Sequence, residues 1–163
     1  MLFRSDGTGW QLLATTGFPG EAALHTLVEQ APQILPLAGS PRLIILGREV
    51  LLGIGSADLI AVEPTGRLAI IEVKLARNSE ARRAIVAQVL TYAAYLNGLD
   101  PGVLERDVLG RHLRDRGYAD LVGAVAVNDQ MGSFDAASFS DGLAVSLSEG
   151  RFRLVLVLDD APE

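Results

Sequence analysis

The chain has 163 residues, of which 49% are hydrophobic and 21% charged, a balance typical of one globular domain rather than a disordered segment. No apolar run approaches the roughly 20 residues that a membrane-spanning helix needs, and no apolar signal region follows Arg4. Without cysteine there are no disulfides or thiolate metal sites, and two histidines cannot build a typical zinc site alone. We therefore expect a single cytoplasmic domain spanning 1–163, with no membrane partner.

The first 30 residues predict a β-hairpin and a helix. The hairpin would span residues 1–16, with its turn at Asp6-Gly7-Thr8-Gly9. The helix is expected from Glu21 to Gln30, because a Pro-Gly pair precedes it and a proline follows it. Glu21 either faces inward or complements the helix dipole from an exposed first turn, and the residues alone favour the second interpretation. His25 is expected to be structural.

A buried strand and a β-hairpin follow. The run RLIILGREVLLGIG predicts a strand covered on both faces and its turn into the next strand. The following strands, ADLIAV and AIIEVKL, flank the segment Glu63-Pro64-Thr65-Gly66. A three-residue loop with Gly66 in the left-handed conformation would pair Glu63 with Arg67.

The same register pairs Asp58 with Glu72, and Lys74 shares a strand face with Glu72. A loop one residue shorter or longer would turn Asp58 to the opposite face. Two ionised carboxylates about 5.5 Å apart repel by roughly 3 kcal/mol at an effective dielectric of about 20, so the arrangement favours a cation. Lys74 supplies part of that charge, and hard oxygen ligands also suit Mg²⁺. An exposed Asp/Glu pair bridged by Lys74 as an ordinary ion pair explains the spacing equally well.

The long helix is expected from Ser79 to Leu96, because Asn78 and Ser79 are cap residues and Asn97-Gly98 ends it. One stripe of this helix is formed by Ala81, Ile85, Gln88, Tyr92 and Leu96. The stripe directs the amide of Gln88 toward the sheet, either as part of a site or as a satisfied core residue. Tyr92 could likewise be core.

The last 60 residues predict further helix and strand. A helix is expected over 101–116, interrupted at Gly110, and the segment 120–129 is typical of a buried strand that lies parallel to an earlier one. Residues 128–140 would form the longest loop, and 143–158 a final hairpin turning at Ser-Glu-Gly. The expected class is α/β, with a mixed central sheet flanked by helices.

Polar residues recur in a fixed order on the first helix, the hairpin and the long helix. In chain order they are Glu21, Asp58, Glu72-Val73-Lys74 and Gln88-x-x-x-Tyr92. This order resembles the PD-(D/E)XK nuclease superfamily, and the Gln-x-x-x-Tyr helix is similar to its RecB-like and NucS-like branches. The similarity covers residues 21–96, although Ala57 stands where the name-giving proline would be. The resemblance implies a restriction-endonuclease-like αβββαβ core over about 21–128, with Glu21 helping to hold water at the metal and Gln88 hydrogen-bonding within the site.

The resemblance also implies the central chemistry. Asp58 and Glu72 would ligate Mg²⁺, or Mn²⁺ as its substitute, and the Val73 carbonyl would be a further ligand. Lys74 would orient or deprotonate the attacking water, or stabilise charge that develops on the phosphate. The implied substrate is DNA or RNA.

Basic charge is concentrated from Glu72 to Arg116, where eight Lys or Arg stand against six Asp or Glu in a chain of net charge −6. The candidate nucleic-acid contacts on the long helix and just before it are Arg77, Asn78, Arg82, Arg83 and Tyr92. A solvated helix face explains the arginines as well. Because an acidic chain is a poor generic polyanion binder, we expect a local footprint, a homodimer or an additional domain to supply affinity. The ending Asp-Asp-Ala-Pro-Glu is typical of a linker, as if the chain were the N-terminal part of a longer protein.

Two functional hypotheses follow. The first is a metal-dependent nuclease that hydrolyses phosphodiester bonds. The second is a catalytically inactive module of the same fold that binds nucleic acid or a protein partner. Four polar residues at positions predicted to lie in apolar surroundings favour the first, because an unpaired buried charge costs several kcal/mol.

Overall fold

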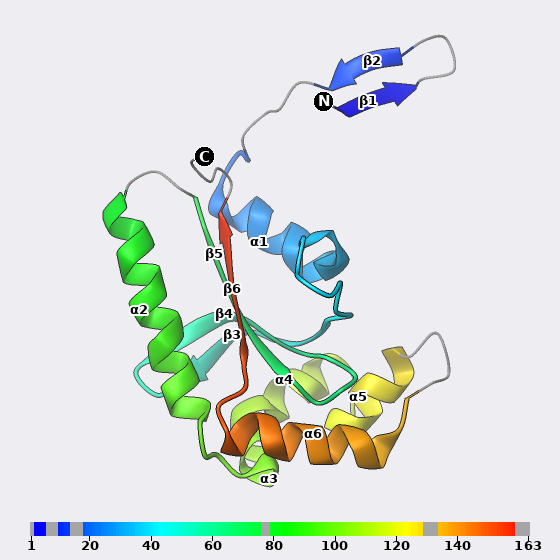
Figure 1. The fold of residues 1–163 in the computed structure, drawn as a ribbon, viewed down its shortest axis with the longest axis vertical. Coiled ribbons are helices and arrows are strands. Elements are labelled where there is room, and N and C mark those ends of the chain that lie inside the picture. The colour runs from blue at the N-terminus through cyan, green and yellow to red at the C-terminus, as the bar shows by residue number, and fades with distance from the viewer. Residues whose placement is uncertain (1, 6–9, 14–17, 76–78, 129–133, 159–163) are drawn as a thin grey trace.

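The chain folds around a four-stranded mixed sheet with helices on both faces (Figure 1). The computed structural model describes residues 2–5, 10–13, 18–75, 79–128 and 134–158. The strands are β1 (Leu2–Ser5), β2 (Trp10–Leu13), β3 (Ile44–Leu52), β4 (Gly55–Val62), β5 (Leu68–Lys74) and β6 (Arg153–Leu158). The helical elements are α1 (Glu21–Gln30), the 3-10 turn η1 (Pro32–Ile34), α2 (Ser79–Leu96), α3 (Pro101–Val103), the π-helical η2 (Leu104–Leu109), α4 (Gly110–Asp115), α5 (Leu121–Asn128) and α6 (Ala136–Ser148).

The strand order is β3-β4-β5-β6. The first three strands are antiparallel neighbours, and β6 lies parallel to β5. β1 and β2 pair separately, which confirms the two strands of the predicted first hairpin, whereas its turn lies outside the described residues. α1 and α2 begin and end where the sequence predicts. Within the described part of the chain, no helix is both long and apolar enough to cross a bilayer.

The sheet separates two hydrophobic clusters. On one face α1 packs Leu24 and Val28 against residues that include Ile71. On the other face α2 contributes Val89, Tyr92 and Leu96 to a larger cluster, which η2, α4, α5 and α6 complete. Figure 1 shows α1 and α2 on opposite sides of the sheet. Residues on both faces of the central strands are therefore buried, as the apolar run in β3 predicts.

The register of the β4–β5 hairpin is the one that the sequence predicts. The ladder ends with Val62 opposite Leu68, and the Glu63 N–H donates to the Arg67 carbonyl (2.9 Å) across a three-residue loop. Gly66 adopts φ +83°, the left-handed conformation. A side chain at this position is disfavoured by the positive φ. It is also excluded by packing, because a Cβ would lie 2.3 Å from a backbone nitrogen of α6.

The strand predicted over 120–129 is wrong, because this segment forms α5. The carboxylate of Asp120 accepts a hydrogen bond from the Gly123 N–H (2.6 Å), as a helix cap does. Leu121, Ala124 and Val125 then fall on one helical face and are buried. The helix predicted over 101–116 is confirmed as the continuous run α3-η2-α4, which passes from π to α geometry at Gly110.

The loop predicted over 128–140 and the final hairpin are also corrected. Asp135 caps α6 by accepting from the Ser138 N–H (2.7 Å), and Phe139, Leu143 and Leu147 recur at helical spacing in the core. Only the second half of the predicted hairpin is a strand, β6. The strand parallel to an earlier one, expected at 120–129, is β6, which lies parallel to β5. The hydrophobic core therefore continues well past residue 128.

Candidate functional site

The candidate site lies where β4 and β5 stop pairing. The last backbone pair is Leu59 with Ile71, and beyond it side chains replace the ladder. The Asp58 N–H donates to Oε1 of Glu72 (3.1 Å), and the Val73 N–H donates to Oδ2 of Asp58 (2.9 Å). The two predicted acids therefore lie side by side, each held by the backbone of the other strand.

A kink in β3 and β4 turns Asp58 toward β5. Ala57 packs in the cluster under α2, whereas Leu59 packs under α1, although residues two apart on a regular strand share a face. Their partners on β3 flank Glu49, which has a positive φ of 51°. The alternation of β4 therefore breaks at Asp58, whose carboxylate reaches the Val73 N–H of β5.

Glu72 is almost completely buried, with 2% of its surface exposed. Burial is the main cause that raises its pKa to about 7, and the nearby charge of Asp58 raises it further. The Asp58 side chain remains 28% exposed. Around neutral pH, Glu72 is therefore partly protonated, and a cation between the two acids would favour the ionised form.

α1 brings polar residues over the same strand ends. Lys74 Nζ donates to Oε1 of Glu21 (2.8 Å), and the Leu75 N–H donates to Oε2 (3.4 Å). The hydrogen bond between Lys74 and Glu21 is the main cause that raises the pKa of Lys74. Glu21 therefore joins the site through Lys74 rather than acting only at the helix dipole, and the ammonium points to α1 instead of bridging the two acids.

His25 belongs to this site, although the sequence analysis treats it as structural. Its ring is buried, and Nε2 lies 4.0 Å from Oδ1 of Asp58. Within the part of the chain that the structure describes, neither ring nitrogen has a hydrogen-bond partner. The signal in the sequence is its spacing, four residues after Glu21, which puts both side chains on one face of α1.

Gln88 lies differently from the prediction. The buried stripe of α2 carries Val89 beside Tyr92, whereas Gln88 is exposed. Its Nε2 donates to the hydroxyl of Tyr92 (2.7 Å), which donates to the Ser56 carbonyl (2.9 Å). Gln88 thus supports the first residues of β4 and not the acid pair directly. Tyr92 packs in the core, which leaves its ring unavailable for stacking on a base.

The other candidate nucleic-acid contacts are placed only in part. Arg77, Asn78 and the side chain of Arg82 lie outside the described residues, and Arg83 is exposed on α2. A second basic group, which the sequence analysis does not single out as a site, comes from β3, α4 and Arg116 just after α4.

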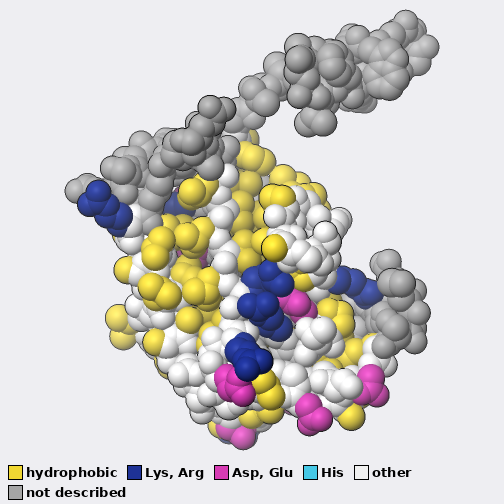
Figure 2. All heavy atoms as spheres, in the orientation of Figure 1, with side chains coloured by type: hydrophobic (Ala, Val, Ile, Leu, Met, Phe, Trp, Pro, Cys, Tyr) yellow, Lys and Arg dark blue, Asp and Glu magenta, His cyan; other side chains and the backbone are white. Residues whose placement is uncertain are grey.

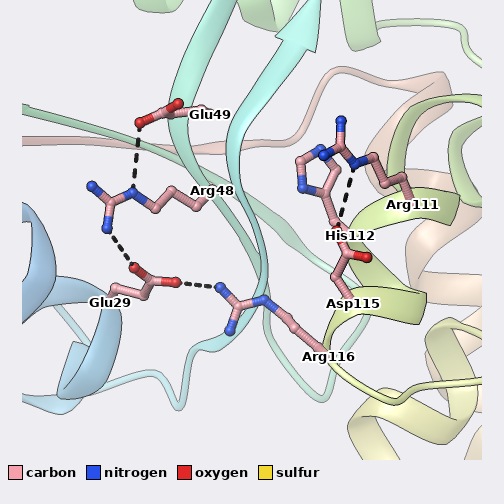
Figure 3. Close-up of a pocket in the computed structure, with 7 residues that line it drawn as sticks. All are labelled: Glu29, Arg48, Glu49, Arg111, His112, Asp115 and Arg116. Carbon is pink, nitrogen blue, oxygen red and sulfur yellow. Dashed lines mark hydrogen bonds and ion pairs between the residues drawn. The ribbon is translucent and has the colours of Figure 1, made fainter.

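This group lines a cavity of about 400 Å³ (Figure 3). The residues around it are Glu29, Arg48, Glu49, Arg111, His112, Asp115 and Arg116. Glu29, four residues after His25 on α1, accepts from both Arg48 (3.2 Å) and Arg116. Arg48 is the cross-strand partner of Leu59, the residue after Asp58, although neither Asp58 nor Glu72 lines the cavity. Burial lowers the pKa of His112, which favours its neutral form.

The acid pair alone does not complete a metal-binding group. Among the described residues, no three His, Asp or Glu side chains gather so that they could hold an ion together. Two carboxylates nevertheless suit Mg²⁺, which proteins commonly bind through one or two carboxylates together with substrate phosphates and water. They do not suit a structural zinc site, which needs four protein ligands of nitrogen or sulfur type.

The chain was compared with known proteins. No protein-family model, no curated protein and no solved structure matches it. What the site does must therefore be argued from its own geometry.

Proposed function

We propose that this chain is a metal-dependent nuclease that hydrolyses phosphodiester bonds of nucleic acid at the Asp58–Glu72 pair. The observation that carries the proposal is the burial of Glu72 against a second carboxylate, with its pKa raised to about 7. Perturbed carboxylates of this kind concentrate at functional sites, because holding two acids together is costly unless a cation or a proton joins them.

The donors present fit a hard divalent cation. Asp58 and Glu72 supply carboxylate oxygens, and the Val73 carbonyl, on the residue after Glu72, is the main-chain candidate. His25 adds a nitrogen that faces Asp58 without a hydrogen-bond partner in the described structure. When bound, Mg²⁺ would supply Lewis-acid polarisation of a phosphate oxygen and lower the pKa of water at the site.

Lys74 and Glu21 supply fixed charge beside that position. Since the Glu21 carboxylate raises the pKa of Lys74, the amine stays protonated at neutral pH. Of the roles that the sequence leaves open, this favours charge stabilisation on the phosphate over removal of a proton from water. Glu21 acts as a positioning residue because it holds the ammonium at the end of β5.

The order of elements supports the same proposal. Around the site the chain runs α1, β3, β4, β5, α2 and finally β6, which is the αβββαβ order that the resemblance implies, with additional helices before the last strand. The cavity lined by Arg48, Arg111 and Arg116 adds a candidate contact for the substrate backbone. Fold analogy alone does not establish an activity, so the side chains carry the argument.

The experiment is a cleavage assay with labelled single-stranded, duplex and branched DNA and with RNA, in Mg²⁺, Mn²⁺ or chelator. We expect metal-dependent cleavage that Glu72→Gln and Asp58→Asn each remove and that Lys74→Ala slows by about 10²-fold or more. Glu63→Gln is the matched control, because Glu63 is also buried but pairs with Arg153 (2.7 Å) away from the site. Cleavage at the wild-type rate in Lys74→Ala and Glu72→Gln would refute the assignment.

The alternative is an inactive module of this fold that binds nucleic acid or a protein. The bond of Lys74 to Glu21 instead of to the acid pair is the observation in its favour. It predicts no cleavage, no heat of Mn²⁺ binding in calorimetry, and unchanged nucleic-acid affinity in Asp58→Asn.

A further inference from the structure

Two cavities meet at the C-terminal end of α1. The first is the arginine cavity of about 400 Å³, where Arg48 and Arg116 reach Glu29 from two sides (Figure 3). The second measures about 540 Å³ and is bordered by α1, η1, β3 and α5. Glu29 and Arg116 line both, so the two cavities adjoin. We call the joined space, from Arg48 at one end to Asn128 at the other, the double cavity.

The lining of the double cavity is basic, although the chain is acidic. Its charged residues are Arg42, Arg48, Arg111 and Arg116 together with Glu29, Glu49 and Asp115. Four cations against three carboxylates leave a net charge of +1, whereas the whole chain carries −6. On the face that Figure 2 shows, the described residues include only a few Lys and Arg, with Asp and Glu beside them. A phosphate is therefore better served by this local group than by that face.

The arginines keep N–H donors for a ligand, although each contacts a carboxylate. Arg48 and Arg116 share the single carboxylate of Glu29. Nε and Nη1 of Arg116, and Nη2 of Arg48, donate to no group of the described residues. Arg111 contacts only Asp115 in that part of the chain, at 3.5 Å, and its side chain is 84% exposed. Because a guanidinium presents five donors in a fork that matches phosphate, the first cavity can still bind one.

The second cavity combines an apolar lining with a fixed polar pair. Leu43 and Ile44 line it and are buried. Nδ2 of Asn128 donates to the Tyr118 hydroxyl (3.0 Å) and to the Ala124 carbonyl (2.8 Å), and these bonds hold the amide and the phenol in place. Among the described residues, nothing donates to Oδ1 of Asn128 and nothing accepts from the Tyr118 hydroxyl. An acceptor and a donor side by side match the edge of a nucleobase, which presents the same groups.

We propose that the double cavity binds one nucleotide of the substrate strand, with its phosphate among the arginines and its base in the second cavity. The choice of nucleic acid as the ligand rests on the proposed nuclease activity. Glu29 follows His25 by one turn of α1, about 5.4 Å, and Nε2 of His25 lies 4.0 Å from Asp58. The double cavity therefore neighbours the acid pair without containing either acid. The bound nucleotide flanks the phosphodiester that is cleaved.

The first test measures the binding of free ligands by calorimetry in chelator, where the proposed hydrolysis does not take place. The probes are inorganic phosphate, a deoxynucleoside and the corresponding deoxynucleoside monophosphate. We expect the monophosphate to bind about tenfold or more tightly than either of its parts, because it engages both cavities at once. A monophosphate that binds no better than inorganic phosphate would overturn the proposal.

Variants assign each part of the ligand to its cavity. Arg111→Met should weaken binding of the monophosphate and of inorganic phosphate by about tenfold, and its exposure makes a folding defect unexpected. Asn128→Leu should weaken the monophosphate alone, so inorganic phosphate also checks that this variant is folded. Arg106→Met is the matched control, because Arg106 is paired with Asp107 and exposed but lines neither cavity. Wild-type affinity for the monophosphate in Arg111→Met or in Asn128→Leu would contradict the arrangement.

The second test asks whether the nucleotide belongs to a bound strand or is a separate ligand. A fluorescent oligonucleotide is bound to the wild-type chain in chelator, and unlabelled monophosphate is added. We expect the monophosphate to displace the oligonucleotide, and Arg111→Met but not Arg106→Met to weaken oligonucleotide binding. A monophosphate that binds without displacing the strand would refute the assignment to the substrate. Displacement by a protein that cleaves nothing would support the double cavity and count against the proposed hydrolysis, so the two proposals can fail separately.

Discussion

Replacing Glu72 by glutamine should stabilise the protein at pH 8 and change little at pH 4. The folded state raises the pKa of Glu72 from 4.5 to about 7. Well below pH 4.5 the Glu72 carboxyl is protonated in both the folded and the unfolded chain. In that range its titration takes nothing from the free energy of unfolding. Between pH 4.5 and 7 the unfolded chain releases a proton that the folded chain retains, and stability falls as pH rises.

The loss can be sized from this shift. One pH unit corresponds to about 1.4 kcal/mol, so an ionised Glu72 lowers the free energy of unfolding by roughly 3 kcal/mol above pH 7. Glutamine cannot ionise, and its Oε1 can still accept from the Asp58 N–H. Glu72→Gln should therefore recover most of this energy at pH 8.

The assay is urea unfolding of wild type and Glu72→Gln in chelator at pH 4, 6 and 8, with the difference between the two proteins as the measured quantity. Glu63→Gln is the control. Glu63 is buried but bonded to Arg153 Nε (2.7 Å), so its replacement should destabilise the protein at both pH 6 and pH 8. A Glu72→Gln variant no more stable than wild type at pH 8 would refute the reasoning.

Three further predictions concern metal affinity, the lysine and the hairpin. Mn²⁺ binding measured by calorimetry should tighten about tenfold from pH 6 to pH 8, because the Glu72 carboxyl must lose its proton first, and equal affinities would contradict this. Lys74→Ala should lower the cleavage rate by about 10²-fold or more, and Glu21→Gln by less, since Glu21 acts only through Lys74; the reverse order would exclude a positioning role. Gly66→Ala should lower the free energy of unfolding by roughly 3 kcal/mol or more, because it adds a clash to positive-φ strain. Gly98→Ala is the control, since Gly98 has φ +79° in open space, and it should cost about 1 kcal/mol. Equal melting temperatures of the two variants would argue against the close packing of Gly66 on α6.

Local chemistry explains why the central hairpin could be predicted from sequence. Loop length and Gly66 set the register, and that register places Asp58 and Glu72 on adjacent strands at the same level. α1 and α2 are similarly bounded by proline, glycine and cap residues close to their ends. Signals of this kind act within a few residues, so no tertiary information is needed to interpret them.

The C-terminal third required information that the apolar pattern lacks. α5 is a short run rich in valine, which suits a buried strand or a buried helix equally, and the cap made by Asp120 decides the outcome. In α6 the alternating segment AVSLS resembles a strand, but Asp135 starts a helix eight residues earlier. His25 was missed for a different reason, since its approach to Asp58 depends on how α1 packs against the sheet.

At the end of the β4–β5 ladder, side chains replace the backbone as hydrogen-bond acceptors, and this limits which substitutions the two positions can accept. Asp58 accepts the Val73 N–H, which would otherwise be an unpaired donor inside the protein. A related sequence without the proposed nuclease activity would therefore still need an acceptor there. Asparagine can take that place and alanine cannot. Position 72 is bound by the same rule, because Glu72 accepts the Asp58 N–H and glutamine can do so as well. If the proposed activity were lost, both positions should therefore drift to amides rather than to apolar residues.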